Sequence, residues 1–523
     1  MNSKEELKSK IEYKTCLSYL GYILRKSKCS DQELSKVKKE LTVQPLFIPG
    51  YGSDEPEKYK IYQENANKLY LPVYYGIKNF GSPEVIKTNQ GLKINCPFNG
   101  SLRPIQKKIV KTYFDSLIKN DNENKNDIYL RGGGVISAGC GVGKTTMSLY
   151  ILSTLGVKGL IVVHNEVLLN QWKERIAQYL PTARIGIIQG PKQDISEKDV
   201  VIGMLKSLGM KKYPDYVFRD FGLVIYDECH HTSAKMFSKA LSKTRFRFTI
   251  GLSATPKRKD GLTNVFLWHL GDIVFKQKKD KDSGVNVIIY KYLNEDPTYS
   301  KTLLNYKKKP NHVQMLTNIA NCQKRNKFIA SLLPPLLKEE RKILILTERL
   351  SEIKWFYDYL ESFLKSHQLE DITFGKYVGG MKETALEESQ SCHILLGTYN
   401  MIEEGFDCKE LDTLIMATPK TDIEQASGRI LRLKPEDRVR PPLIIDIWDI
   451  FCNFKNKGLL RMKYYKKKDY STKLYEVDDN LKSKTIKLIS SSINSSESNQ
   501  SNSLENKKET TKPLIKIKFS DDD

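Results

Sequence analysis

The chain has 523 residues, of which 40% are hydrophobic and 28% charged, an ordinary composition for a globular protein of two to four domains. Its formal net charge is +23, which favours a polyanionic partner such as nucleic acid. No apolar run approaches the ~18 residues that a membrane span requires, and the first residues lack the apolar core of a secretory signal, so we expect no membrane partner.

The first 95 residues combine lysine-rich helical stretches with clustered aromatic residues and prolines, as in the run from Tyr70 to Gly76. This pattern predicts a small folded accessory domain, residues 1–95, without a catalytic constellation. A purely packing role and a separate function are equally open for it.

A different pattern begins near residue 100, where short apolar runs rich in Val and Ile alternate with stretches able to form helices. Such runs are typical of strands buried on both faces of a parallel α/β sheet. In the first unit the predicted strands are residues 134–137, 160–163, 200–202, 223–226 and 248–250.

A charged stretch, residues 276–282, interrupts this pattern and predicts an exposed connection. The pattern then resumes in a second unit, with predicted strands at residues 343–346, 394–397, 413–416 and 443–446. The apolar periodicity ends after Tyr475, and the serine- and asparagine-rich segment that follows cannot bury enough surface to offset its chain entropy. We therefore predict α/β units at residues 96–280 and 281–475, and a disordered tail at 476–523.

The loop after the first predicted strand has the phosphate-binding (Walker A) pattern, with alanine in place of the first glycine. Small residues let backbone N–H groups point at phosphate oxygens, Lys144 would reach the β- and γ-phosphates, and Thr145 would ligate Mg²⁺. A glycine-rich turn without a ligand is the alternative, and the strand–loop–helix context disfavours it. The predicted ATP-binding residues are Ala138, Gly139, Cys140, Gly141, Val142, Gly143, Lys144, Thr145 and Thr146.

Two carboxylates follow the strand at residues 223–226. Taken alone, such a pair is more often a surface turn, but after a phosphate-binding loop Asp227 is expected to hold Mg²⁺ and Glu228 to polarise the attacking water. The adjacent histidines, His230 and His231, have no partners at zinc spacing. The nine cysteines include no Cys-x-x-Cys pair, so we expect a reduced, intracellular protein without zinc.

Further segments complete an ordered set of seven motifs that resembles the superfamily two helicases. They are Leu102 to Gln106, Gly251 to Pro256, Gly397 to Tyr399, Glu404 to Asp407 and Gln425 to Arg432, together with the phosphate-binding loop and the DEAH-like box Asp227 to His230. The resemblance spans roughly residues 100–470 and implies two tandem RecA-like lobes that bind ATP.

Within this superfamily, the segment Lys257 to Leu262 is similar to the XPB/UvsW type of DNA-repair helicase. Three segments resemble the poxvirus-type transcript-release DNA helicases of large cytoplasmic DNA viruses: Tyr377 to Met401, Ala417 to Gln425 and the N-terminal run Tyr70 to Gly76. This narrower resemblance implies a viral protein of the cytoplasmic replication and transcription site, with packaging in the virion as a further implication.

The resemblance also implies roles for individual residues. Arg103 and Gln106 would lie by the adenine, and Gly405 and Asp407 near the ribose. Gln425 would approach the γ-phosphate, and Arg429 and Arg432 would act as arginine fingers, because guanidinium groups stabilise charge that builds on that phosphate. Four residues would couple ATP hydrolysis to movement along the nucleic acid: His230, Ser253, Ala254 and Thr255. Nucleic-acid contacts would be Asn165, Gly203, Met204, Thr347, Arg349 and Thr398.

The sequence therefore predicts an ATP- and Mg²⁺-dependent DNA helicase or translocase that acts in viral transcription. A viral RNA polymerase and nascent RNA are expected partners beside single- or double-stranded DNA. A repair or recombination helicase, an RNA helicase and a non-catalytic nucleic-acid-binding scaffold are the alternatives. A metabolic P-loop kinase is disfavoured, because it would need no second unit that ends in paired arginines.

Overall fold

The computed structural model divides into two compact units, Met1–Lys278 and Lys279–Asp523, which are treated separately below. Among the helices that the structure describes, none is both long and apolar enough to cross a lipid bilayer. The described residues are 13–46, 56–119, 129–139, 141–228, 234–254, 256, 258, 260–277, 284–306, 308–403, 406, 408–433, 435–479 and 484–492.

The first unit begins with a small domain built on a mostly antiparallel sheet of order β5-β6-β2-β1-β7. Its first helix starts at a capping box, in which Ser30 and Glu33 each satisfy the other's backbone N–H. The elements are β1 Thr15–Ser18, β2 Gly21–Arg25, α1 Asp31–Glu40, β3 Thr42–Val43, β4 Tyr59–Lys60, β5 Gln63–Glu64, β6 Lys68–Leu71, α2 Val73–Phe80 and β7 Val85–Lys87.

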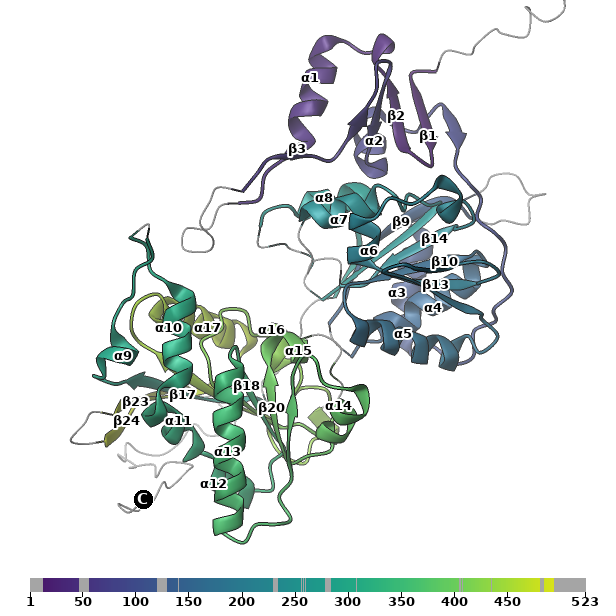
Figure 1. The fold of residues 1–523 in the computed structure, drawn as a ribbon. Helices are drawn as coiled ribbons and strands as arrows, with labels where there is room; N and C mark the ends of the chain where they lie inside the picture. The colour runs from purple at the N-terminus through teal and green to yellow at the C-terminus, as the bar shows by residue number, and fades with distance from the viewer. Residues whose placement is uncertain are drawn as a thin grey trace, which may run out of the picture. The chain divides into compact units, whose positions relative to one another are not determined.

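This small domain packs on the α/β domain of the same unit through α2 and α8 (Thr263–Leu270) (Figure 1). Leu262 and Val265 are buried in the small domain's apolar core, and the ring of Tyr75 meets that of Trp268 edge-on at 5.3 Å. The Tyr74 hydroxyl lies 3.2 Å from Thr249 Oγ1 on a strand of the α/β sheet. The small domain is thus built onto the first α/β domain.

The α/β domain of the first unit, lobe 1, has a sheet of order β12-β11-β13-β10-β14-β15-β9-β16, with β8 paired to β9. Helices α3 to α5 cover one face, and α6 to α8 cover the other. The elements are α3 Pro104–Asp115, β8 Ile118–Lys119, β9 Tyr129–Ser137, α4 Lys144–Leu155, β10 Gly159–Val163, α5 Glu166–Tyr179, β11 Ile185–Gln189, β12 Lys192–Asp194, β13 Val200–Met204, α6 Leu205–Met210, β14 Leu223–Tyr226, α7 Ala234–Leu241, β15 Phe248–Ser253 and β16 Ile273–Lys276.

The second unit, lobe 2, has a sheet of order β19-β20-β18-β21-β22-β17-β23-β24. Its elements are β17 Asn286–Leu293, α9 Pro297–Ser300, α10 His312–Asn321, α11 Gln323–Ala330, α12 Leu333–Lys338, β18 Ile343–Thr347, α13 Leu350–Ser366, β19 Phe374–Tyr377, α14 Glu383–Gln390, β20 Ile394–Thr398, α15 Tyr399–Glu403, β21 Thr413–Met416, α16 Glu424–Ser427, β22 Leu443–Asp449, α17 Phe454–Lys468, β23 Ser471–Asp479 and β24 Lys484–Ser492.

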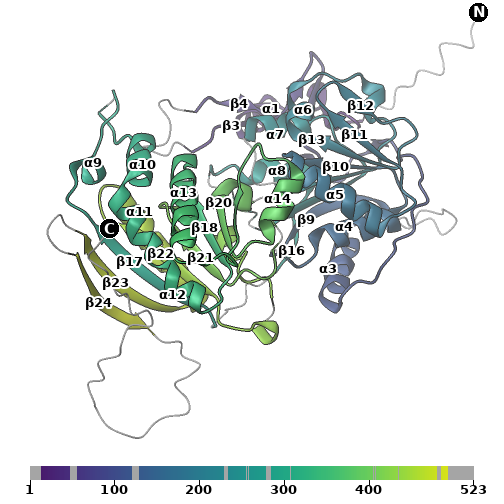
Figure 2. The same cartoon turned by 60° about the horizontal axis from the view of Figure 1, so that its bottom comes forward.

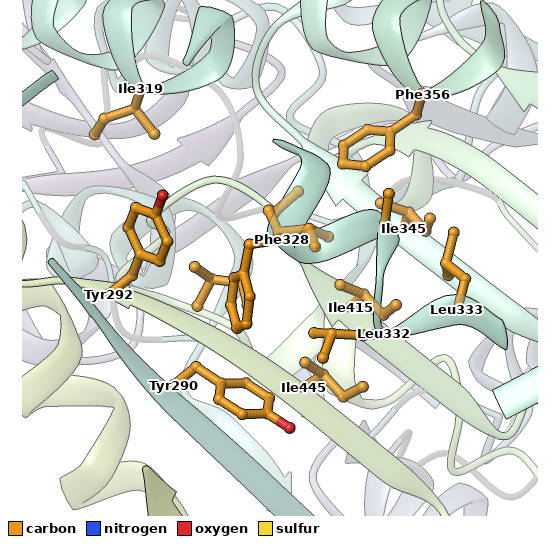
Figure 3. Close-up of a cluster of buried hydrophobic side chains, with 14 of the residues drawn as sticks. Tyr290, Tyr292, Ile319, Phe328, Leu332, Leu333, Ile345, Phe356, Ile415 and Ile445 are labelled. Carbon is orange, nitrogen blue, oxygen red and sulfur yellow. The ribbon is translucent and has the colours of Figure 1, made fainter. Parts of the chain in front are cut away.

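An apolar core holds the α10 to α13 layer against the lobe 2 sheet (Figure 3). Tyr290 from β17 and Ile445 from β22 line the sheet side, while Phe328 from α11 and Phe356 from α13 reach in from the helices. Both α/β units are therefore mostly parallel sheets with helices on both faces. The predicted tandem RecA-like architecture is confirmed.

The end of the chain corrects one predicted boundary. We expected a disordered tail from residue 476, but β23 runs through Asp479, and β24 pairs with it antiparallel at the edge of the lobe 2 sheet (Figure 2). Serines of β24 take part in this pairing, because a ladder of backbone hydrogen bonds does not require apolar side chains. The rest of the predicted tail, from residue 493, lies outside the described residues.

Candidate ATP-hydrolysis site

The predicted phosphate-binding loop joins β9 to α4 in lobe 1. The strand ends at Ser137 and the helix begins at Lys144, with its first turn directed at the loop. Gly141 and Gly143 have φ of +78° and +90°, a conformation that favours glycine. The loop therefore has the backbone that the sequence pattern requires, whereas Cys140 lies outside the described residues.

Three side chains hold this loop in place. Arg103 Nη2 donates to the carbonyl of Val142 at 2.6 Å, and Gln106 Nε2 donates to the same carbonyl at 2.9 Å. On the other side, Gln277 Oε1 accepts from the N–H of Gly139 at 3.0 Å. Arg103 and Gln106 thus bind the loop itself in this structure, and their predicted adenine contact remains a prediction.

Gln277 escaped prediction because it lies in the charged stretch that we expected to be an exposed connection. That stretch in fact begins inside β16, which ends at Lys276, and the backbone N–H of Gln277 continues the pairing by donating to Ser137 at 2.8 Å. Hydrogen bonds between residues so far apart in the chain leave no local sequence signal.

Lys144, the first residue of α4, lies close to the Glu228 side chain. Its Nζ donates to the carbonyl of Ala138 at 3.1 Å and lies 3.8 Å from Glu228 Oε1, with both side chains largely buried. Glu228 has φ of +44°, an unfavourable conformation for a residue with a side chain, directly after the end of β14. The catalytic role expected for Glu228 remains a prediction.

The Asp227 carboxylate is held by two donors. Trp172 Nε1 donates to Oδ2 at 2.8 Å, and the backbone N–H of Glu228 donates to Oδ1 at 3.0 Å. Burial, followed by the neighbouring Glu228 carboxylate, raises the pKa of Asp227 to about 6, while the Trp172 hydrogen bond and Lys144 act in the opposite direction. Sequence reasoning missed Trp172, because nothing in its local pattern separates it from an ordinary core residue.

The side chains and backbone N–H groups at this edge of the lobe 1 sheet are of the kinds that bind Mg²⁺ and a nucleotide. Thr145, at the start of α4, supplies a hydroxyl and Asp227 a carboxylate, the hard oxygen ligands that Mg²⁺ prefers. An ideal Cβ at Gly141 would meet nothing within 4 Å, so the loop leaves open space at this position. The backbone N–H groups at the start of α4 and the Lys144 ammonium would bind phosphate oxygens.

The predicted coupling segment begins on β15, beside the loop. Ser253 is fully buried and its carbonyl accepts from the N–H of Ala138 at 3.1 Å, which joins the ends of β15 and β9. Ala254 is 8% exposed. Thr255 and His230 lie outside the described residues, so their predicted roles remain predictions.

Of the nucleic-acid contacts predicted in lobe 1, two lie at the surface and one is buried. Asn165 caps α5, its Oδ1 accepting from the N–H of Leu168 at 2.8 Å. Met204 ends β13 and is half-buried, but Gly203 is buried between neighbouring strands, and a Cβ there would lie 3.0 Å from Leu208. Gly203 therefore lies inside the sheet in this structure, and its predicted contact remains a prediction.

Of the contacts predicted in lobe 2, Thr347 is buried in this structure, and its predicted contact remains a prediction. It is 1% exposed, and its hydroxyl donates to Glu352 inside the lobe, so its side chain supports the loop after β18. Arg349 is half-buried, with Nε donating to Thr317 at 3.2 Å and Nη2 donating to the carbonyl of Val313 at 3.1 Å. Thr398, at the end of β20, is half-buried.

The paired arginines of lobe 2 converge on one carbonyl. Arg429 Nη1 donates to Phe406 O at 2.8 Å, and Arg432 Nη2 donates to the same oxygen. Arg429 is 5% exposed, whereas Arg432 and Gln425 are half-buried. Gly405 and Asp407 lie outside the described residues, so the structure brings together the arginines of the predicted set but does not describe its ribose side.

Comparison with known proteins supports the helicase resemblance. Residues 99–258 match the family model described as "Type III restriction enzyme, res subunit". The chain is 34% identical over 479 residues to "Putative ATP-dependent RNA helicase L396" of Acanthamoeba polyphaga mimivirus, covering 90% of this chain and 89% of the relative. It is 27% identical to "Putative ATP-dependent RNA helicase QP509L" of African swine fever virus (strain Badajoz 1971 Vero-adapted), covering 84% and 88%.

A solved structure agrees with the fold. The "fragment structure of a putative HsdR subunit of a type I restriction enzyme from Vibrio vulnificus YJ016" has a TM-score of 0.50 and 14% identity, covering 73% of this chain and 70% of that one. This likeness shows the fold alone, whereas the similarity to the mimivirus protein extends along nearly the whole of both chains. The chain belongs to the family of superfamily two helicases found in large DNA viruses.

Proposed function

We propose that this protein is a nucleic-acid-dependent ATPase that uses ATP and Mg²⁺ to translocate on DNA. The observation that carries the proposal is the meeting of Lys144 and Glu228, 3.8 Å apart, beside the Asp227 carboxylate at the end of β14. These side chains supply a phosphate-binding cation, an activating carboxylate and a metal ligand at one edge of the sheet.

In this mechanism each group has a separate task. The N–H groups at the start of α4 and the Lys144 ammonium bind phosphate oxygens, and Asp227 with Thr145 would hold Mg²⁺, which neutralises charge on the phosphates. Glu228 orients the attacking water and accepts its proton. By the helicase resemblance, Arg429 and Arg432 would stabilise the charge that develops on the γ-phosphate during transfer.

The track is proposed to be DNA, and the cellular task to be viral transcription, including transcript release beside a viral RNA polymerase. Support comes from the net charge of +23 and from the resemblance carried by the segments that surround the helicase motifs. An RNA track is the second candidate, since the names of the mimivirus and African swine fever virus relatives describe RNA helicases. A repair or recombination role is compatible with the same DNA motor.

The steady-state ATPase rate tests these assignments. It should be measured without nucleic acid, with double-stranded DNA, with single-stranded DNA and with RNA, beside a Lys144→Ala control. We expect stimulation by DNA that disappears in the control. Stimulation by RNA alone would replace the DNA proposal with an RNA helicase, and absence of hydrolysis under every condition would contradict the enzymatic proposal and leave a binding scaffold.

Salt dependence provides an independent test of the track. Each phosphate contact releases bound counterions, so log affinity falls with log salt by about 0.9 per phosphate contacted on a duplex. We expect a steep loss of affinity for DNA between low and moderate salt. A flat response would contradict binding through the backbone phosphates.

A further inference from the structure

The buried indole of Trp172 links α5, whose N-cap Asn165 is a predicted nucleic-acid contact, to the carboxylate proposed to hold Mg²⁺. Trp172 is 1% exposed and lies in the second turn of α5. Its Nε1–H, the only polar group of the side chain, donates to Asp227 Oδ2 at 2.8 Å. The two residues come from different elements, α5 and the end of β14.

This hydrogen bond fixes how the carboxylate is turned. The backbone N–H of Glu228 already holds Oδ1 of Asp227 at 3.0 Å, and the indole holds Oδ2. With one donor on each oxygen, rotation of the carboxylate about its terminal bond breaks both contacts. Side chains that orient a metal ligand in this way commonly change metal affinity by 10- to 100-fold when they are replaced.

A tryptophan that only fills the core does not need a carboxylate as the acceptor for its N–H group. Trp448, buried in lobe 2, satisfies its own Nε1–H with the backbone carbonyl of Lys455 at 3.1 Å. An indole that only fills space can therefore use a main-chain acceptor. The Trp172 donor instead meets a side chain of the proposed reaction site.

The same indole connects that carboxylate to the start of α5. Asn165 caps this helix, and Trp172 lies seven residues further on, ~10 Å along the axis at 1.5 Å per residue. The strand before the helix, β10, pairs with β14, and the N–H of Asp227 donates to Val162 O at 3.0 Å. A displacement of the α5 start would therefore reach Asp227 through a short helix segment and one hydrogen bond.

We propose that Trp172 is a positioning residue, which orients Asp227 for Mg²⁺–nucleotide and transmits nucleic-acid occupancy at the start of α5 to that carboxylate. The transmission part rests on the proposed function, because it requires a nucleic acid at Asn165. The orientation part does not, since metal binding can be measured without any nucleic acid. Failure of the two parts is therefore distinguishable.

The first experiment compares Trp172→Phe with Trp448→Phe, since each variant removes one buried indole N–H. Mn²⁺, as a paramagnetic probe for the Mg²⁺ site, is titrated with ADP present and detected by electron paramagnetic resonance. We expect Mn²⁺ affinity to fall about 10-fold in Trp172→Phe and to stay at the wild-type value in Trp448→Phe. Wild-type Mn²⁺ affinity in folded Trp172→Phe, checked by circular dichroism, would overturn the proposal.

A second measurement leaves Trp172 in place, so it does not depend on folding of that variant. Replacing the three other tryptophans, Trp268, Trp355 and Trp448, by Phe makes Trp172 the sole indole fluorophore. Because its N–H contacts the proposed metal ligand, we expect Mg²⁺ with ADP to shift its emission, and ADP with a chelator to leave it unchanged. The same spectrum in both conditions would overturn the proposal.

The transmission part has its own readout. At saturating Mg²⁺ and ATP, we expect the ratio of DNA-stimulated to basal ATPase rate to fall several-fold in Trp172→Phe and to remain unchanged in Trp448→Phe. An unchanged ratio in Trp172→Phe, together with weakened Mn²⁺ binding, would overturn transmission and keep orientation. If wild-type protein shows no stimulation by any nucleic acid, the proposed function fails while the metal measurements still decide the orientation part.

Discussion

The ammonium group of Lys144 lies 3.8 Å from the carboxylate of Glu228, although one residue starts α4 and the other follows β14. The two charges belong to different steps of the proposed reaction, phosphate binding and water activation. Their proximity means that removing either side chain changes the surroundings of the other. Binding and hydrolysis therefore have to be measured separately in each variant.

For Glu228→Gln we expect nucleotide binding to survive and hydrolysis to fall by at least ~100-fold, because the amide cannot accept the proton of the attacking water. For Lys144→Ala we expect weaker nucleotide binding as well, since the phosphate-binding cation is lost. A fluorescent ATP analogue reports binding, and phosphate release reports turnover. Near-normal turnover in Glu228→Gln would contradict the assignment of Glu228.

Packing in lobe 2 predicts an effect of opposite sign to helix propensity. Ala in place of Gly458, inside α17, should by propensity stabilise the helix by about 1 kcal/mol. However, an ideal Cβ at Gly458 would lie 2.1 Å from Trp448 Nε1, so we expect Gly458→Ala to destabilise lobe 2 by ~1–3 kcal/mol.

Urea unfolding followed by fluorescence of the lobe 2 tryptophans measures this effect. Lys463→Ala, on an exposed position of the same helix, is the matched control and should change stability by no more than ~0.5 kcal/mol. Stabilisation by Gly458→Ala would show that the ring moves aside without loss of packing.

The sequence predicted most of the buried parallel strands, although it missed β17, and it predicted the edges of the sheets poorly. All nine predicted strands lie within β9, β10, β13, β14, β15, β18, β20, β21 and β22. A strand that is apolar at every position is stable only where both faces of the sheet are covered, so its place in the fold can be read from the sequence. The strand β11, next to the edge strand β12, and the edge strand β19 instead alternate buried and half-buried residues, and β24 is largely polar, so the pairing of these strands is decided by their neighbours.

The candidate-site residues also divide into those that a local sequence pattern predicts and those that it does not. Lys144, Asp227 and Glu228 were predictable because their chemistry is tied to a local pattern of loop and strand end. Trp172 and Gln277 were not, since each acts through one hydrogen bond to a residue distant in the chain. The motifs also did not indicate that Thr347 and Gly203 are buried, because a motif pattern carries no information on the packing around each of its residues.

The third prediction rests on a difference in burial between two arginines of the same motif. Arg432 is half-buried and Arg429 is 5% exposed, and both donate to Phe406 O. We expect Arg432→Ala to lower the ATPase rate by ~10³-fold, the usual effect of losing a guanidinium that acts on the γ-phosphate, with little loss of stability. Arg429→Ala should lower both the rate and the stability of lobe 2, because it also leaves a buried void.

Thermal unfolding beside phosphate release separates the two arginines. Equal stability losses in both variants would contradict the contrast drawn from burial. An unchanged ATPase rate in folded Arg432→Ala would remove that residue from the reaction.

The final prediction concerns pH and a buried network in lobe 2. Arg325 pairs with Asp449 through two hydrogen bonds of 2.8 and 2.9 Å, and contacts Glu352 at 3.3 Å. Burial raises the pKa of Glu352 from its ordinary value of 4.5 to about 7, with Asp449 acting in the same direction and Arg325 and the Thr347 hydroxyl against it. Protonated Glu352 leaves one cation and one carboxylate, a neutral buried pair.

Between pH 4.5 and 7 the folded state therefore holds a proton at Glu352 that the unfolded chain has released. A group of this kind makes stability fall as pH rises through that window and level off above it. We expect Glu352→Gln to remove this slope, and Asp358→Asn, at an exposed position of the same helix, to keep it. Urea midpoints for lobe 2 from pH 5 to 8 measure the slope, and identical slopes in wild type and Glu352→Gln would show that Glu352 stays ionised beside Arg325.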